Sequence, residues 1–315
     1  MKNEILNNNS IYIADVGASG GLNKRWEKDC FNVKGVLFEP DPDSFKALTK
    51  NQNSDLIYIN SALSNVKKEV SLNICKWREA SSIFEPNFDI LKNFVDPERF
   101  EVIDKIILET ERLDVLLKDT PIKELDFIKL DTQGSELEIL KGCENNLDKM
   151  IGIEVEVEFI EIYKNQPLFE NVHEYIISRG FTLFDLKKTF WKKNHYFHNI
   201  EKGQLIYADA LYFKTPESIL KIENISKEKV VKSIFIYLAY GYLSLSEEIL
   251  DSGLKQNIFS NIEYRTIKKF LNSEFKTTIL PDFKGKGRLH NLFSFLSKKL
   301  LINSFSSGTD TKLGN

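Results

Sequence analysis

Cysteine is scarce in this sequence, and long apolar runs are missing. The 315 residues include three cysteines, Cys30, Cys75 and Cys143, which lie far apart and form no C-x-x-C pair. This spacing excludes a disulfide framework and a zinc knuckle, and it is typical of a reducing cytosol. The nearest approach to a membrane span, residues 234–245, is shorter than the roughly 18 apolar residues required, and MKNEILNNNS has no apolar signal core. We therefore expect a cytoplasmic protein.

Proline and glycine are also sparse, and neither sign of charge dominates. With 8 Pro, 15 Gly, 42% apolar and 28% charged residues, the composition is that of a packed globular protein. The net charge of −3 shows no basic excess of the kind that binds nucleic acid. Residues 1–215 hold 28 basic and 36 acidic residues, whereas residues 216–315 hold 15 and 10. We expect an acidic body with a basic extension, and no nucleic-acid partner.

The first part of the chain alternates strand-like and helix-like segments. Residues 11–16, 34–38 and 56–59 are apolar runs without a helical period, which is typical of buried strands. Helices are expected between them, over 23–31 and from a cap at Asp43 to about residue 50. This rhythm with short links predicts a parallel sheet covered by helices on both faces.

The strand pattern continues to Lys214 and then stops. Further strands are expected at 125–130 and 151–159, and helices after Gln133 and over 172–179. Two last strands, 181–186 and 206–213, should pair antiparallel because their linker is too irregular for a crossover helix. Only helical runs follow, at 227–242, 246–254 and 261–271. We predict one domain over 1–215, a helical extension over 216–303 and a disordered, frayed tail over 304–315.

The turn DVGASGG, residues 15–21, follows the first strand directly. Glycines there permit positive φ and close approach of a ligand, and a following helix N-terminus favours an anion. A dinucleotide site requires G-x-G-x-x-G, but Ser19 stands where the second glycine would be. The pattern instead suits an amino-acid headgroup, with backbone N–H groups for its carboxylate and Asp15 for its ammonium. The methionine half of S-adenosylmethionine is such a headgroup.

Two acidic residues stand at the ends of later strands. Glu39 lies 22 residues after Gly17, where a carboxylate can accept both hydroxyls of a ribose; a solvated carboxylate is the alternative. Asp131 ends the strand at 125–130. Ligands bind beyond the carboxyl ends of parallel strands, so Asp131 should face donor and acceptor. The alternative role for Asp131 and for Thr132, the residue after it, is capping of the next helix. We prefer that role for Thr132 only.

Three carboxylates, those of Glu154, Glu156 and Glu158, alternate along IEVEVEF. They share one face of a strand that should be central in the sheet. Burial of unpaired charges is costly, so some of them must be paired, protonated or near the open end of the strand. We expect Glu158 nearest the active site; an edge strand with a wet face is the alternative.

Seven blocks of the sequence resemble the FkbM-type methyltransferase family: DVGASGG, FEPDP, NSALS, ASSIFEPN, DFIKLDTQGSELEILKG, EVEFIEIYKNQPLF and GQLIYADALYF. The resemblance covers residues 10 to 214 approximately. It implies an α/β, class I methyltransferase (Rossmann-like) fold, with a mostly parallel seven-stranded sheet and helices on both faces, here followed by an α-helical C-terminal extension. It also implies S-adenosylmethionine as donor, S-adenosylhomocysteine as product, and a hydroxyl acceptor, often on a sugar. Members often have Glu-Gly where this chain has Gln133-Gly134.

The resemblance also implies site residues. The donor's methionine part would contact the glycine turn, its ribose Glu39, and its adenine Ser61 and Ala62. The predicted cofactor residues are Asp15, Gly17, Ala18, Ser19, Gly21, Glu39, Ser61, Ala62 and Asp131. Acceptor-side candidates are Trp77, Arg78, Ser81, Ser82, Asn87, Tyr163 and Gln166. Trp77 is included because aromatic faces stack on sugar rings.

An alcohol acceptor must lose its proton, so a general base is expected. The candidates are Asp131, Glu158 and His195, in that order; the linker after the penultimate strand should bring Trp191, His195 and His198 over the active site. A divalent ion held by Asp131 and one of the three glutamates is an alternative that we do not favour. We predict an O-methyltransferase acting on a sugar hydroxyl of a surface glycan, polysaccharide or glycosylated natural product.

Two other functions compete with this one. An NAD-dependent sugar oxidoreductase would need a Y-x-x-x-K pair, and the one present, Tyr264 with Lys268, falls in the helical extension. A non-catalytic interaction protein could keep the fold without turnover.

The extension ends in a basic amphipathic segment, residues 284–303. Its cations are Lys284, Lys286, Arg288, Lys298 and Lys299, and its apolar residues at helical spacing are Leu289, Leu292, Phe293, Leu296 and Leu300. Such a helix can lie on an anionic membrane. For a cytoplasmic protein this would be the inner face of the cell membrane. Packing of its apolar stripe onto the body or onto a second subunit of a homo-oligomer is the alternative that we favour.

Overall fold

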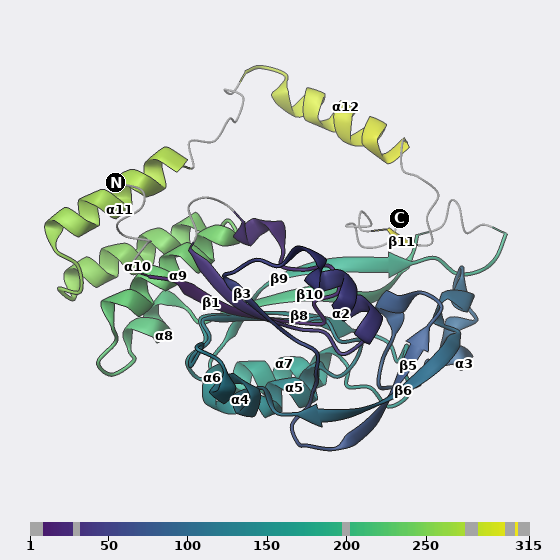
Figure 1. The fold of residues 1–315 in the computed structure, drawn as a ribbon. Helices are drawn as coiled ribbons and strands as arrows, with labels where there is room; N and C mark the ends of the chain where they lie inside the picture. Colours follow the sequence, from purple (N-terminus) through teal and green to yellow (C-terminus); the bar gives the residue numbers. More distant parts are fainter. Residues whose placement is uncertain (1–8, 28–31, 197–201, 275–282, 300–305, 308–315) are drawn as a thin grey trace.

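The structure, a computed structural model, describes residues 9–27, 32–196, 202–274, 283–299 and 306–307. In the described residues the main sheet has the order β11-β9-β10-β8-β7-β1-β2-β3, with the two-residue β11 (Ser306–Ser307) at its edge. Seven strands make up the rest of the sheet. They are β1 (Ile11–Val16), β2 (Val33–Phe38), β3 (Leu56–Ile59), β7 (Phe127–Leu130), β8 (Gly152–Glu158), β9 (Thr182–Trp191) and β10 (Gln204–Phe213). Strand β10 is antiparallel to both neighbours, and the other pairs among these seven are parallel. The predicted seven-stranded class I methyltransferase sheet is thereby confirmed (Figure 1).

A second sheet was not predicted. It consists of β4 (Ala62–Leu63), β5 (Glu69–Cys75) and β6 (Val102–Glu111), in the order β4-β6-β5. Strand β6 carries exposed Ile103 and Ile107 on one face and half-buried Ile106 and Leu108 on the other. Because apolar residues occupy both faces, the alternation that marks a half-buried strand is absent from its sequence. The sheet and the short helix α3 (Phe88–Leu91) lie beside the carboxyl ends of the main strands (Figure 1).

Several helix starts differ from the sequence expectation. In place of a helix over 23–31, the described residues contain only the 3-10 turn η1 (Lys24–Trp26), capped by Asn23. Helix α2 (Pro42–Leu48) is capped by Asp41, whose carboxylate accepts the N–H of Asp43. The cap lies at Asp41 because Pro42 supplies a fixed φ and needs no N–H partner at the first helical position. The predicted cap at Asp43 was wrong.

The two faces of the main sheet have separate cores. One face packs on α4 (Leu113–Leu116), α5 (Glu136–Gly142), α6 (Glu144–Leu147) and α7 (Phe169–Ser178). The other packs on the C-terminal helices α8 (Pro216–Leu220), α9 (Lys227–Ala239), α10 (Leu243–Lys255) and α11 (Asn261–Glu274). The sheet is therefore covered on both sides, as expected of a parallel sheet.

Helix α9 belongs to the core. Its residues from Val230 to Ala239 are all buried, in one cluster with Ile11, Phe127 and Phe213 of the sheet. Lys229 and Lys232 of this helix form ion pairs with the buried Asp126. The expected change of secondary structure after residue 215 is present, but sheet and extension share one core.

The last two elements lie apart from this core. Helix α12 (Lys286–Lys299) stands away from the body (Figure 1). Strand β11 (Ser306–Ser307), within the tail expected to fray, pairs antiparallel with the end of β9. In the described parts of the chain, we find no helix with the length and apolar character that a membrane crossing requires.

Candidate functional site

A cavity of about 710 Å³ lies at the carboxyl ends of β1, β2 and β7. Every residue predicted to bind the cofactor lines it: Asp15, Gly17, Ala18, Ser19, Gly21, Glu39, Ser61, Ala62 and Asp131. Arg78 and Ser81, from the loop after β5, line it as well. The topology thus brings together, at one sheet edge, segments that are far apart in the sequence.

The glycine turn has a different local role from the one expected. Gly17 has φ +81°, and a Cβ at this position would lie 1.9 Å from the backbone oxygen of Asp131. The absence of a side chain at Gly17 therefore lets the backbone at the end of β7 pack closely against the turn. The N–H groups of Gly17 and Ala18 donate to the backbone oxygen of Phe38 at 3.0 and 3.1 Å. Those two N–H groups are engaged within the fold, and the described residues place no α-helix directly after the turn. The expected helix N-terminus is therefore not found among the described residues, and binding of a carboxylate at this turn stays a prediction.

Asp15 ends β1 as a buried carboxylate beside the cavity. Its Oδ1 atom has no hydrogen-bond partner in the structure, and Lys129 Nζ lies 3.8 Å from that atom. Burial raises the pKa of Asp15 to about 6, although Lys129 opposes the shift. Burial lowers the pKa of Lys129, but Asp15 and Asp131 outweigh it, so this pKa is raised. An unpartnered buried carboxylate oxygen facing a cavity suits a cationic group.

Glu39 is buried at the end of β2 and lines the same cavity. Its Oε1 accepts the N–H of Asp41 at 2.9 Å. Burial raises the pKa of Glu39 to about 7, and the carboxylates of Asp41 and Asp15 add to the shift. Both acidic groups at the cofactor end therefore change charge near neutral pH.

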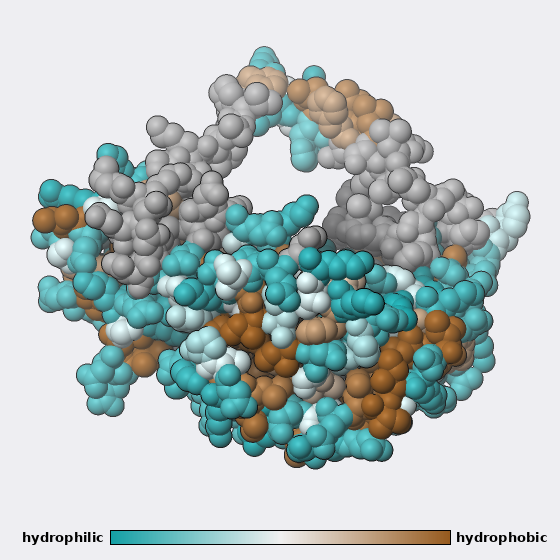
Figure 2. Space-filling view, in the orientation of Figure 1, coloured by the Kyte–Doolittle hydropathy of each residue, from teal (hydrophilic) through white to brown (hydrophobic). Residues whose placement is uncertain are grey.

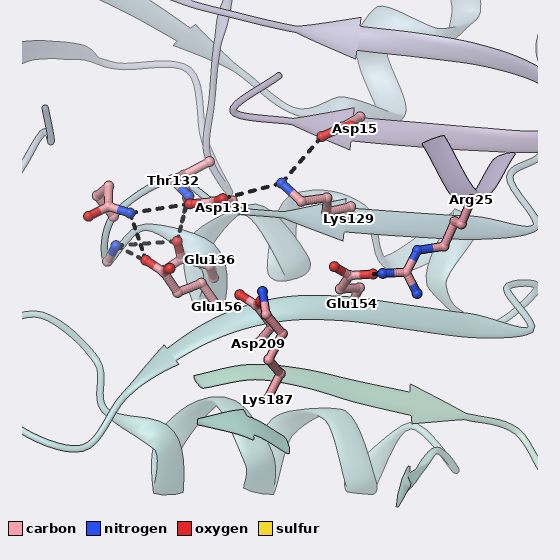
Figure 3. A network of polar contacts seen from close by, with 12 residues as sticks. Asp15, Arg25, Lys129, Asp131, Thr132, Glu136, Glu154, Glu156, Lys187 and Asp209 are labelled. Atoms are coloured by element: carbon pink, nitrogen blue, oxygen red, sulfur yellow. Dashed lines mark hydrogen bonds and ion pairs between the residues drawn. The ribbon is translucent and has the colours of Figure 1, made fainter. Parts of the chain in front are cut away.

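Asp131 is held from two sides, as Figure 3 shows. Lys129 Nζ lies 3.2 Å from its Oδ2, and Gln133 Nε2 donates to its Oδ1 at 3.2 Å. Gln133 also donates to Glu156 Oε1 at 2.6 Å, and its Oε1 lies 2.9 Å from the Tyr163 hydroxyl. Gln133 adopts φ +57°, a left-handed conformation that is costly for a residue with a side chain. The amide links the exposed carboxylate of Asp131 to the buried carboxylate of Glu156.

The three glutamates of β8 are buried in a central strand, as predicted, and each has different surroundings. Tyr240 donates to Glu154, and Gln133 donates to Glu156. Glu158 Oε1 has no hydrogen-bond partner in the structure. Burial raises the pKa of Glu158 well above its ordinary value, and the carboxylates of Glu136 and Asp131 add to this. Glu158 is not part of the cavity lining, so the structure places it behind the site and not at its rim.

Glu136 is a further buried carboxylate behind the cavity. It accepts the N–H and hydroxyl of Thr132 and the N–H of Gly134. Thr132 was assigned to helix capping, and in the structure it holds Glu136 at the start of α5. Among the described residues, no group of three or more His, Cys, Asp or Glu side chains is arranged to hold a metal ion.

The acceptor-side candidates are divided between cavity and core. Arg78 lines the cavity and pairs with Asp41 at 2.5 Å and Asp43 at 2.8 Å. Ser82 is buried and donates to the backbone oxygen of Gln133 at 2.6 Å. Tyr163 is fully buried beneath Gln133. Ser82 and Tyr163 therefore position Gln133 and do not line the cavity.

The remaining candidates lie outside the cavity lining. Gln166 is buried and accepts the N–H of Tyr163, and Trp77 is 42% exposed near Arg99. His195 is exposed on the loop after β9, while Trp191 is buried. Asn87 is buried before α3. His198 lies outside the described residues.

Lys129 and Asp41 are among the lining residues that sequence reasoning missed. Lys129 lies two positions before Asp131 and so on the same face of β7, which was a usable signal. Asp41 follows Glu39 by two positions, but its role depends on Arg78. Burial raises the pKa of Asp41, but hydrogen bonds from Arg78 and Ser44 outweigh this and hold that pKa below its ordinary value.

The sequence matches the methyltransferase FkbM domain family over residues 15–183. The chain belongs to this family. The matched span begins at Asp15 and ends in β9, so it contains the whole cavity lining. The predicted family and the methyltransferase class are thereby confirmed. Comparison with curated proteins gave no match.

Several solved structures share a distant likeness. TrmK from M. capricolum, in complex with S-adenosylhomocysteine, is 13% identical, with coverage of 86% of this chain and 91% of that one and a TM-score of 0.33. Precorrin-6y C5,15-methyltransferase from Geobacter metallireducens is 10% identical, with coverage of 68% and 85% and a TM-score of 0.34. A putative RNA methyltransferase from Pyrococcus horikoshii is 10% identical, with coverage of 64% and 74% and a TM-score of 0.32.

Proposed function

We propose that this protein is an S-adenosylmethionine-dependent O-methyltransferase that methylates a sugar hydroxyl in a surface glycan, polysaccharide or glycosylated natural product. The observation that carries the proposal is the single cavity in which Asp15, Glu39 and Asp131 meet. The carboxylates of Asp15 and Glu39 suit the donor, and the carboxylate of Asp131 remains for the acceptor.

The donor fits the residues present. The ammonium of its methionine part would neutralise the unpartnered Oδ1 of Asp15. Glu39 would accept hydrogen bonds from the ribose hydroxyls, and Ser61 and Ala62 would border the adenine. When bound, the donor supplies a methyl group on a positively charged sulfur.

The acceptor is activated by the protein in two ways. The cavity would position the acceptor oxygen against the donor's methyl group, and such positioning can supply most of the acceleration. Asp131 would take the proton of the acceptor hydroxyl, and the bound donor would supply the methyl group. Lys129 and Gln133 fix the orientation of the Asp131 carboxylate during this step. Arg78 and Ser81 line the same cavity and would offer polar contacts to the sugar.

The alternative oxidoreductase lacks support at this site. Tyr264 donates to Asp251, and Lys268 pairs with Glu247, both on the C-terminal helices and outside the cavity lining.

The test is methyl transfer from isotopically labelled S-adenosylmethionine to a panel of glycans, read by mass spectrometry. We expect one added methyl on one sugar, lost in Asp131→Asn. Donor binding without any methylated product across the panel would instead favour a non-catalytic protein, and failure to bind S-adenosylhomocysteine would contradict the proposal altogether.

A further inference from the structure

Helix α12 presents an apolar surface that the described parts of its own chain leave exposed. Leu289, Leu292, Phe293 and Leu296 are 40 to 60% exposed, at positions that share one side of a helix. Figure 2 shows this apolar group on the segment that stands off from the body. We favoured packing of the stripe onto the body or onto a second subunit; the structure does not show these four residues packed onto the body, and packing onto a second subunit stays untested.

The charge of the same segment restricts what can cover it. Residues 284–303 contain five Lys or Arg and no Asp or Glu. Lys284 and Arg288 are exposed beside the apolar side chains. Two copies of α12 packed together would bring like charges into contact, which disfavours a helix-to-helix dimer. A surface that is both apolar and anionic complements the helix in both respects.

The dimensions of α12 also point to a position along a surface. Its 14 residues give a length of roughly 21 Å, which is too short to cross a bilayer of roughly 30 Å. Amphipathic helices with cations beside a short apolar face lie in the plane of the lipid headgroups.

The helix is connected to the catalytic end of the sheet. Strand β11 pairs with Phe190 and Trp191 at the carboxyl end of β9. Strand β9 runs in the same direction as β8, because β10 is antiparallel to both, so this end is also the cavity end. The seven-residue step from Lys299 to Ser306 can span at most roughly 25 Å.

We propose that α12 binds the protein peripherally to an anionic lipid bilayer, with its apolar side chains inserted among the headgroups and its cations facing the lipid phosphates. Bound in this way, the cavity end of the sheet lies near the membrane surface. This inference does not depend on the identity of the acceptor.

The test is vesicle flotation of the full-length protein, with phosphatidylcholine vesicles that contain or lack phosphatidylglycerol. We expect binding only to the anionic vesicles, with weaker binding at high salt. Leu292→Glu/Leu296→Glu should abolish binding. Lys284→Glu/Arg288→Glu should weaken it roughly tenfold or more, since each cation near an anionic surface contributes roughly a fivefold effect.

Two controls make the result decisive. Lys123→Glu/Lys149→Glu reverses two exposed cations just before β7 and β8, at the end of the sheet opposite the cavity, and should leave binding unchanged. The mass of each variant in solution, measured by light scattering, tests the alternative occupant. Equal binding by all variants, absence of binding to anionic vesicles, or a lipid-free dimer that Leu292→Glu/Leu296→Glu converts to a monomer would each overturn the proposal.

Discussion

Lys129 Nζ lies 3.8 Å from Oδ1 of the buried carboxylate of Asp15. Burial raises the pKa of Asp15 to about 6 against the opposing effect of Lys129, and burial raises the pKa of Glu39 to about 7. We therefore expect the carboxyl groups of Asp15 and Glu39 to become fully ionised when a cationic ligand binds.

The affinity for S-adenosylhomocysteine should depend on pH. The ligand's ammonium favours ionised Asp15, and its ribose favours ionised Glu39, so binding lowers both pKa values. By linkage the affinity falls as pH decreases through 7 and 6. We expect calorimetry to show binding roughly tenfold to a hundredfold weaker at about pH 5.5 than at about pH 8. Asp15→Asn should bind weakly at both pH values with a smaller difference, and a flat profile in the wild type would contradict the assignment.

The general base can be identified by comparing two variants. Asp131→Asn should lower kcat by roughly 10²- to 10⁴-fold while the affinity for S-adenosylhomocysteine changes little. Glu158→Gln should keep most of the activity, because Glu158 lies behind the lining and its raised pKa means that a neutral amide mimics its protonated form. His195→Ala serves as an exposed control. If Glu158→Gln lost activity and Asp131→Asn did not, the two roles would have to be exchanged.

Gln133→Glu would restore the residue that family members often have, and we expect it to destabilise this chain. It would place a third carboxylate against Asp131 and Glu156, which cannot all ionise together. The free energy of unfolding should fall by roughly 1–3 kcal/mol, and by more at high pH, where the extra proton is harder to retain. Gln52→Glu, at an exposed position, is the matched control for chemical denaturation. Equal stability of both variants would argue against the linked arrangement.

The glycine turn offers a test of backbone geometry. Gly17→Ala should destabilise the protein by roughly 2–4 kcal/mol, because its Cβ would overlap the backbone of Asp131 at a positive φ. Gly20→Ala meets nothing within 4 Å and should be neutral. Thermal unfolding distinguishes the two, and similar midpoints would show that the turn can relax.

Truncation tests whether the extension is part of the core. A chain that ends at Lys214 should be insoluble or unfolded, because it exposes Phe213, Phe127 and Ile11. A chain that ends at Glu274 should keep the unfolding midpoint of the full protein, since the described α12 side chains are largely exposed. Circular dichroism checks both, and a soluble, cooperatively unfolding 1–214 fragment would show two independent domains.

Local patterns in the sequence determined the main sheet and the antiparallel last pair of strands, and every residue that they marked as a donor contact lines the cavity. These features depend on short-range signals: apolar runs, a glycine turn and acidic residues directly after strands. The position of the Asp131 carboxylate followed from the rule that ligands bind at the carboxyl ends of parallel strands.

Only the tertiary structure decided which polar residues face the cavity and which lie behind it. Glu158 and Tyr163 were both predicted site residues, yet they are buried outside the cavity lining, and Tyr163 lies beneath Gln133. The engaged N–H groups of the glycine turn depend on Phe38 of β2, and the core role of α9 depends on the uncovered face of the sheet. Such contacts join residues distant in sequence, and a local pattern contains no information about them.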